Sequence, residues 1–235
     1  MMTLPSPQPA IEKNLAIHEK TFHSKVSPWL RAIAYPLLRR IILPLYFRNI
    51  EVYGQENIPL DGPVILAPTH RSRWDAIMVP FATGRHVTGR DLRFLVTVDE
   101  VKGFQGWGIR NLGGFPVDPR RPAIASLRYV VEILLNREML VIFPEGNIFQ
   151  DGELHPLKPG LARMAIQAES FQENLGVKIL PMTIHYSPNI PRWRGKVKII
   201  IGKPLSVAEY TEGSIKQQAK KLTEDLTEAL QAIHL

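Results

Sequence analysis

The sequence predicts an α/β fold in which a mostly parallel central sheet is flanked by helices and preceded by an amphipathic helical segment. Short apolar runs alternate with helical patterns from about residue 50 onward, which is the order found in β-α-β units. The chain has 235 residues, of which 45% are hydrophobic, so we expect one domain with a substantial core. No internal repeat or low-complexity tract interrupts this succession.

Three parts are expected along the chain: a polar arm over residues 1–27, amphipathic helices over 28–49, and an α/β domain over 50–235. Ser27-Pro28 is a typical helix start, because serine caps a helix and proline fits its first position. The arm shows neither the unbroken apolar core nor the cleavage site of a signal peptide.

The segment over 28–49 combines Leu, Ile, Trp and Tyr with several arginines. Pro36 and Pro44 predict a kink or a division, so we expect two short helices. This composition suits a segment that lies on a membrane surface. A helical pair packed on the protein's own core would show the same pattern, so both interpretations stay open.

Within the α/β domain, strands and helices are expected in turn. The expected strands are short and apolar: 50–53, 64–67, 92–98, 115–117, 139–143, 177–184 and 197–201. The expected helices follow a start signal or carry one apolar face: 75–81, 122–136, 161–170 and 214–233. The glycine-rich stretch 101–112 is expected to be a helix or a turn region. The helix over 122–136 is the clearest, since Ile124, Leu127, Val131 and Leu134 recur at helical spacing.

The net charge of +7 and the sequence pI of about 9.7 indicate an anionic partner, such as a phospholipid surface, a phosphate ester or an acidic protein. The absence of cysteine excludes disulfide scaffolds, thiolate zinc sites and cysteine nucleophiles. The most apolar stretch, 29–47, is interrupted by Arg39 and Arg40, so we expect no transmembrane helix.

A histidine and an aspartate follow the expected strand 64–67. In Thr69-His70-Arg71-Ser72-Arg73-Trp74-Asp75, the last four residues have the form of a capping box. His70 would then lie just before the helix and Asp75 in its first turn. The Asp75 carboxylate could accept from one ring nitrogen and leave the other free to take a proton. A chance spacing, with Asp75 only a helix cap, is the alternative.

A second stretch, Phe143-Pro144-Glu145-Gly146, follows the expected strand 139–143. Gly146 permits a sharp turn with exposed amides, and Glu145 places an acid at a strand end. Such a carboxylate could bind substrate hydroxyls or order neighbouring basic groups; a tight turn with a solvated carboxylate is the alternative. Parallel strands bring their carboxyl ends together, so His70 and Glu145 could face one pocket.

A basic turn lies between these two stretches. After Gly113-Gly114 and the expected strand 115–117 come Arg120 and Arg121, whose guanidinium forks suit phosphate oxygens. A solvated basic loop is the alternative.

Together these stretches resemble the glycerolipid acyltransferase family, of the 1-acyl-sn-glycerol-3-phosphate (lysophosphatidic acid) acyltransferase type. The family's first motif is Asn-His-x-Ser-x-x-Asp, which the chain matches except for Thr69. Its third is Phe-Pro-Glu-Gly-Thr-Arg-Ser, which the chain follows as far as Gly146 and then replaces with Asn147-Ile148-Phe149. In the second motif, arginine comes one place late, at Arg120. The apolar-Pro-apolar step of the fourth is similar to the chain around Pro181.

The resemblance implies transfer of a fatty acyl group from acyl-CoA or acyl-carrier protein to a lysophospholipid hydroxyl, with no metal or other cofactor. His70 would be the general base and Asp75 its orienting partner. Arg120 or Arg121, with Glu145 and Gly146, would hold the acceptor's glycerol phosphate. The enzyme would sit peripherally on the cytoplasmic face of a phospholipid membrane.

Two alternatives remain from the sequence. The acceptor could instead be glycerol 3-phosphate, another lysophospholipid or a lyso-aminolipid. The chain could also be a non-enzymatic basic module that binds membranes. Nucleic acid is not an expected partner, because the basic residues are dispersed and no nucleic-acid-binding motif is present.

Overall fold

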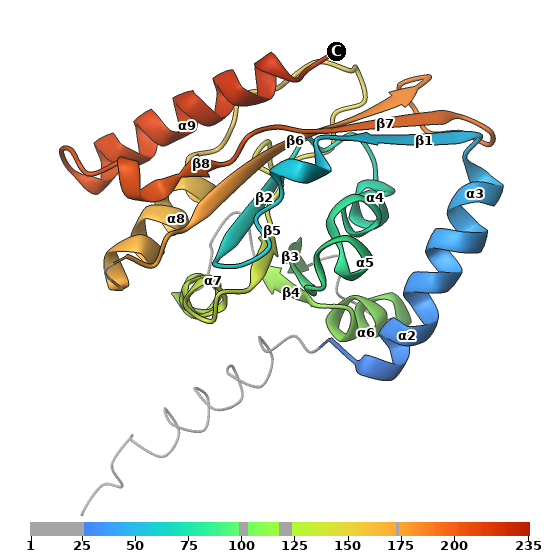
Figure 1. The fold of residues 1–235 in the computed structure, drawn as a ribbon, viewed down its shortest axis with the longest axis horizontal. Coiled ribbons are helices and arrows are strands. Elements are labelled where there is room, and N and C mark those ends of the chain that lie inside the picture. Colours follow the sequence, from blue (N-terminus) through green and yellow to red (C-terminus); the bar gives the residue numbers. More distant parts are fainter. Residues whose placement is uncertain (1–25, 99–102, 118–123, 173) are drawn as a thin grey trace, which may run out of the picture.

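A mostly parallel sheet of eight strands forms the centre of the molecule, as expected (Figure 1). The computed structural model describes residues 26–98, 103–117, 124–172 and 174–235. The strands are β1 (Asn49–Tyr53), β2 (Val64–Pro68), β3 (Leu92–Thr97), β4 (Gly114–Val117), β5 (Met139–Val141), β6 (Lys178–Ser187), β7 (Lys196–Ile201) and β8 (Leu205–Ser206). Their order is β1-β7-β6-β2-β5-β3-β4, with β8 beside β6. All pairs are parallel except β6 with β7 and β6 with β8.

Helices cover both faces of this sheet. They are α2 (Pro28–Leu37), η1 (Leu38–Ile42), α3 (Leu43–Tyr46), η2 (Gln55–Asn57), α4 (Asp75–Thr83), α5 (Arg85–Thr88), α6 (Gly103–Asn111), α7 (Ile124–Leu135), α8 (Gly160–Phe171), η4 (Val207–Glu209) and α9 (Ile215–Ala232). In Figure 1, α7, α8 and α9 lie on one side of the sheet, and α3, α4 and α5 on the other.

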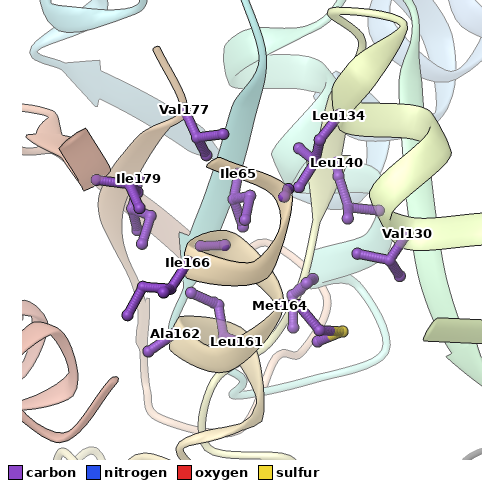
Figure 2. Packing of buried hydrophobic residues seen from close by; sticks show 14 of the residues in the cluster. Ile65, Val130, Leu134, Leu140, Leu161, Ala162, Met164, Ile166, Val177 and Ile179 are labelled. Atoms are coloured by element: carbon purple, nitrogen blue, oxygen red, sulfur yellow. The ribbon is translucent and has the colours of Figure 1, made fainter. Parts of the chain in front are cut away.

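The buried core is divided by the sheet into two clusters. Successive residues of a strand point to opposite faces, so Ile65 packs with α7, α8 and α9, whereas Leu66 packs with α3 and α4. Figure 2 shows the first cluster, in which Ile65, Leu140 and Ile179 of the sheet meet Leu134 of α7 and residues of α8. β2 is buried along its whole length and is the middle strand of the order given above. The chain that follows it therefore lies at the centre of the carboxyl edge.

The N-terminal helices run in one course along the edge of the molecule (Figure 1). We expected Pro36 and Pro44 to kink or divide the segment, and the α-helical hydrogen bonding is indeed divided between them. The division is a π-helical turn, η1, which continues the helix with a wider turn instead of breaking it. Leu43 and Phe47 are buried in the second core cluster, so the end of the segment packs on the domain.

Several expected boundaries shift when the strands pair. The expected strand 139–143 ends at Val141, shortly before Pro144, which has no N–H for a ladder. The expected strand 177–184 runs on to Ser187, because it pairs antiparallel with β7. The short elements α5 and β8 were not expected.

Candidate active site

The two motif stretches meet at the carboxyl edge of the sheet, as their positions predicted. β2 and β5 are parallel neighbours, so the loops that follow them lie side by side. The His70 N–H donates to Oε2 of Glu145 at 2.7 Å, and the His70 ring stacks on Phe143 with ring centroids 3.9 Å apart. His70 and the turn that begins at Phe143 are therefore in direct contact.

Asp75 holds His70 in place, as its spacing predicted. His70 Nδ1 lies 2.9 Å from Asp75 Oδ2, and the aspartate side chain is completely buried. The same oxygen accepts from the backbone N–H groups of Arg71 at 2.6 Å and Ser72 at 2.7 Å. Because a carboxylate accepts hydrogen bonds, we assign the ring hydrogen to Nδ1, which leaves Nε2 as the proton acceptor.

Asp75 caps the loop as well as orienting the ring, although the capping box differs from the expected one. The Ser72 hydroxyl accepts from Trp74 N–H at 3.3 Å instead of from the amide of Asp75. The reciprocal half of the box is present, since the Asp75 carboxylate accepts from the Ser72 amide. His70 thus lies outside the helix, where its ring folds back onto Asp75.

Tyr186 completes the surroundings of Asp75, a role that was not predicted from the sequence. Its hydroxyl donates to Asp75 Oδ1 at 2.7 Å. Burial, reinforced by the negative charge of Asp75, raises the pKa of Tyr186 far above its ordinary value, so the hydroxyl keeps its hydrogen. The sequence signal was the apolar alternation of β6, which continues past Ile184 and sets Tyr186 on the same face.

Glu145 forms a buried ion pair with Arg71. Both carboxylate oxygens lie 2.9 Å from Arg71 Nη1, and Oε1 also accepts from His155 N–H at 3.0 Å. Arg71 Nη2 donates to the carbonyl oxygen of Glu153 at 2.8 Å. Of the two roles expected for Glu145, the contacts are those of a carboxylate that orders a basic group. Contact with the acceptor remains a prediction.

Gly146 forms the sharp turn that its sequence position predicted. Its φ of +73° is in the left-handed region that favours glycine. Its amide donates to the Phe143 carbonyl at 3.1 Å, so this N–H is engaged within the turn and is not exposed. A Cβ at this position would lie 2.6 Å from Nζ of Lys158, whose side chain fills the space.

Comparison with known proteins identifies the family. The model of the family described as Acyltransferase matches residues 49–185. The chain belongs to the acyltransferase family. It is 25% identical over 189 residues to a 1-acyl-sn-glycerol-3-phosphate acyltransferase of Bacillus subtilis, covering 79% of this chain and 88% of that protein. A Saccharomyces cerevisiae protein of the same name is 26% identical over 222 residues, which cover 88% of this chain and 67% of that protein.

A solved structure shares the fold of this acyltransferase. The 1-acyl-sn-glycerophosphate acyltransferase PlsC from Thermotoga maritima superposes with a TM-score of 0.62 at 24% identity, covering 87% of this chain and 79% of that chain. At this identity the likeness supports the α/β fold with its mostly parallel sheet and its N-terminal helices.

The structure accounts for two departures of this acyltransferase from the family motifs. Thr69 is buried, donates its amide to Met182 O, and accepts from the Ile184 N–H through its hydroxyl at 3.0 Å. The threonine therefore ties the His70 loop to β6. Phe149 donates its N–H to the His70 carbonyl at 2.9 Å, while Ile148 exposes 40% of its surface.

Arg120 and Arg121 lie outside the residues that the structure describes, so their phosphate-binding role remains a prediction. Among the described residues, no group of three or more His, Cys, Asp or Glu side chains is arranged to hold a metal ion. The described site offers this acyltransferase an oriented histidine beside two buried carboxylates.

Proposed function

We propose that this acyltransferase transfers a fatty acyl group from acyl-CoA or acyl-carrier protein to the free hydroxyl of 1-acylglycerol 3-phosphate, giving phosphatidic acid. The observation that carries the proposal is the His70–Asp75 pair, in which Nδ1 is bonded to a buried carboxylate and Nε2 is left to accept a proton. The names of the similar proteins support the same acceptor.

Each step of the reaction has a group to perform it. Nε2 of His70 takes the proton of the acceptor hydroxyl while the oxygen attacks the thioester carbonyl. The negative charge of Asp75 stabilises the imidazolium that forms. When the tetrahedral intermediate collapses, the C–S bond breaks, and the thiolate leaves with the proton returned by His70. No acyl group is carried by the enzyme, which agrees with a chain that contains no cysteine.

The acceptor's phosphate needs a cationic site. We assign Arg120 and Arg121 to it, because they follow β4 in the sequence, and β4 ends at the carboxyl edge that also carries His70. Glu145 serves this site indirectly, since its contacts place Arg71 and the His70 amide.

The N-terminal helices are assigned to docking on an anionic phospholipid surface at the cytoplasmic face. Five large apolar residues at intervals of four expose 43–60% of their surface: Trp29, Ile33, Leu37, Ile41 and Leu45. In an α-helix, residues four apart differ by about 40° in direction, so such a stripe drifts around the helix. The π-helical turn η1 has more residues per turn and offsets this drift, which keeps the five side chains on one side. No described helix is long and apolar enough to span a bilayer.

Basic side chains accompany this stripe. Arg39, Arg40 and Arg48 are exposed and line a pocket of about 420 Å³ together with Phe47 and Phe81. Guanidinium groups beside an apolar face favour adsorption on anionic headgroups. Such docking places the site where the lysolipid acceptor lies and where the product stays.

A transfer assay over a panel of acceptors tests the proposed reaction. The panel contains 1-acylglycerol 3-phosphate, glycerol 3-phosphate, other lysophospholipids and a lyso-aminolipid, each with acyl-CoA and with acyl-carrier protein. We expect 1-acylglycerol 3-phosphate to give the highest kcat/KM. If 1-acylglycerol 3-phosphate were not acylated while another acceptor of the panel was, the acceptor assignment would be wrong and the acyltransferase chemistry would stand.

Substitution of His70 separates catalysis from docking. His70→Ala should lower transfer by about 10² to 10⁴-fold, the usual contribution of a general base, and leave vesicle binding unchanged. Ile33→Asp combined with Ile41→Asp should instead weaken binding to phosphatidylglycerol vesicles by about 100-fold or more. Ile215→Asp is the matched control, since Ile215 is equally exposed but begins α9, away from α2 (Figure 1). Transfer that persists in His70→Ala would contradict the mechanism.

A further inference from the structure

Lys158 lies across the glycine turn of the active site. A Cβ built on Gly146 would come within 2.6 Å of Lys158 Nζ, 2.7 Å of Cε and 2.8 Å of Cδ. The backbone N–H of Lys158 donates to the carbonyl of Pro144 at 2.8 Å. The lysine is therefore anchored at its backbone, and its stem occupies space that only a glycine at position 146 leaves free.

This contact places the ammonium group against the turn that packs on His70. Gly146 bonds to Phe143 through its amide, and Phe143 stacks on the His70 ring. Glu145, between them, accepts from the His70 amide. Lys158 thus covers the short turn whose other residues hold the catalytic histidine.

The charge of Lys158 is free to meet a ligand. Its side chain is exposed, and its Nζ has no hydrogen bond or ion pair within the described ranges of the chain. The other groups around the turn are committed. Arg71 is buried and paired with Glu145, and Asp151 is bonded to His155 at 2.7 Å. Ile148, two residues beyond Gly146, presents an exposed apolar side chain.

We propose that Lys158 binds the phosphate of the acceptor and thereby sets the acceptor hydroxyl at His70. The inference rests on the proposed function. In 1-acylglycerol 3-phosphate, the free hydroxyl and the phosphate ester are on adjacent carbons, so a cation that binds the phosphate has to lie beside the general base. Lys158 lies against the Gly146 turn, whose Phe143 and Glu145 contact His70, and its three rotatable N–H donors suit a phosphate dianion. Gly146 is required because a side chain there would displace the ammonium group.

The test is a comparison of Lys158→Met with Lys158→Arg and with Lys216→Met. Methionine keeps most of the apolar stem but removes the charge. Arginine keeps the charge, and Lys216 is an exposed lysine on α9. In Lys158→Met we expect KM for 1-acylglycerol 3-phosphate to rise at least about tenfold, the value of one charge-assisted hydrogen bond, with a smaller change in kcat. Lys158→Arg should retain most of the affinity, and Lys216→Met should match the wild type.

Two further measurements distinguish this role from a structural one. Slow transfer to a phosphate-free monoacylglycerol should be unchanged in Lys158→Met, because that acceptor has no phosphate to bind. Adding Ile148→Arg to Lys158→Met should restore the affinity for 1-acylglycerol 3-phosphate, since the new guanidinium would extend from the same turn.

The results that overturn the inference are distinct from those that overturn the proposed function. An unchanged KM for 1-acylglycerol 3-phosphate in Lys158→Met, or a rise in KM for acyl-CoA alone, would refute the role of Lys158 and leave the proposed reaction standing. Equal losses with both acceptors would also refute it. A wild-type enzyme that does not use 1-acylglycerol 3-phosphate would refute the proposed function itself.

Discussion

Two histidine–aspartate pairs lie next to each other in this acyltransferase, and their contacts look alike. His70 Nδ1 is 2.9 Å from Asp75, and His155 Nε2 is 2.7 Å from Asp151. Each histidine ring stacks on a phenylalanine. His70 lies 3.9 Å from Phe143, and His155 lies 3.7 Å from Phe149, between ring centroids. A short histidine–carboxylate distance therefore does not by itself distinguish a catalytic pair.

The surroundings of the two carboxylates differ. The Asp75 side chain is fully buried and accepts from Arg71 N–H, Ser72 N–H and the Tyr186 hydroxyl, besides His70. The Asp151 side chain is 50% exposed. A charge in a buried, hydrogen-bonded site acts on its neighbour with little screening, whereas an exposed pair contributes little. We therefore assign catalysis to the buried pair.

Removing the charge from each aspartate in turn gives the largest expected contrast. In Asp75→Asn, the amide oxygen can replace Oδ2 and the amide nitrogen can donate to Tyr186, so the loop keeps its geometry. We expect kcat to fall by about 10² to 10⁴-fold, because the imidazolium loses its stabilising charge. The matched variant, Asp151→Asn, should stay within about twofold of the wild type. Comparable losses of kcat in both variants would show that the buried pair is not special.

The carboxylate that joins the two pairs offers the next test. Glu145 accepts from the backbone N–H groups of both His70 and His155 and neutralises Arg71. Glu145→Ala would leave a buried guanidinium unpaired, so we expect the free energy of unfolding to fall by about 3–5 kcal/mol. Denaturant unfolding measures this loss, and Glu132→Ala, an exposed site on α7, is the control.

The same contacts predict that replacing both partners of the ion pair destabilises the protein less than removing Glu145 alone. Replacing Arg71 as well, in Arg71→Met with Glu145→Leu, removes the unpaired charge and should recover part of the stability. It should not recover activity, because the His70 amide still lacks its acceptor. Full recovery of transfer in the double variant would contradict the positioning role of Glu145.

Tyr186 is a donor that only the buried pair possesses. In Tyr186→Phe, Oδ1 of Asp75 becomes a buried acceptor without a donor, which should cost about 1–3 kcal/mol of stability. We expect a several-fold fall in kcat, smaller than that of Asp75→Asn because the charge remains. If Tyr186→Phe had the same free energy of unfolding and the same kcat as the wild type, the Tyr186 contact would be dispensable.

Much of the fold could be predicted because its signals are local. A buried strand such as β2 is a short apolar run, and a helix such as α9 shows its apolar stripe within one segment. The π-helical turn between Pro36 and Pro44 could not be predicted, because the prolines mark a disturbance without saying whether the chain bends or widens its turn. The two-residue strand β8 is too short to show any periodicity.

In the site, as in the fold, the contacts between residues close in sequence were predictable and the long-range contacts were not. His70 and Asp75 are five residues apart, so a helix start between them was enough to suggest their contact. Arg71 and Glu145 are separated by 74 residues, and Asp75 and Tyr186 by 111. Those contacts depend on which strands are neighbours in the sheet, and the order of strands along the chain does not determine that. Because parallel strands end at the same edge of the sheet, Glu145 was expected near His70. That argument did not show that Glu145 would form a buried ion pair with Arg71.

A third histidine extends the comparison, because no described carboxylate is bonded to His185. It lies next to Tyr186 on β6, its ring packs at 5.0 Å from that of His234, and its buried Nε2 has no partner among the described residues. Burial, together with the nearby charges of His234, Arg71 and Lys198, lowers the pKa of His185 to about 4. In the unfolded chain the pKa would be near 6.5. The unfolded state therefore binds more protons between these values, and stability is lost as the pH falls from about 6.5 towards 4.

His185→Gln should remove this loss. We expect the variant to gain stability relative to the wild type between pH 7.5 and 4.5, by about 1 kcal/mol, since the half-buried ring is partly screened by solvent. Denaturant midpoints at the two pH values measure the gain. Lys198→Met is a second test, because removing a nearby cation should raise the pKa of His185 in an NMR titration. A parallel pH dependence of His185→Gln and the wild type would contradict the assignment and would mean that a histidine without a carboxylate is tolerated here at no cost.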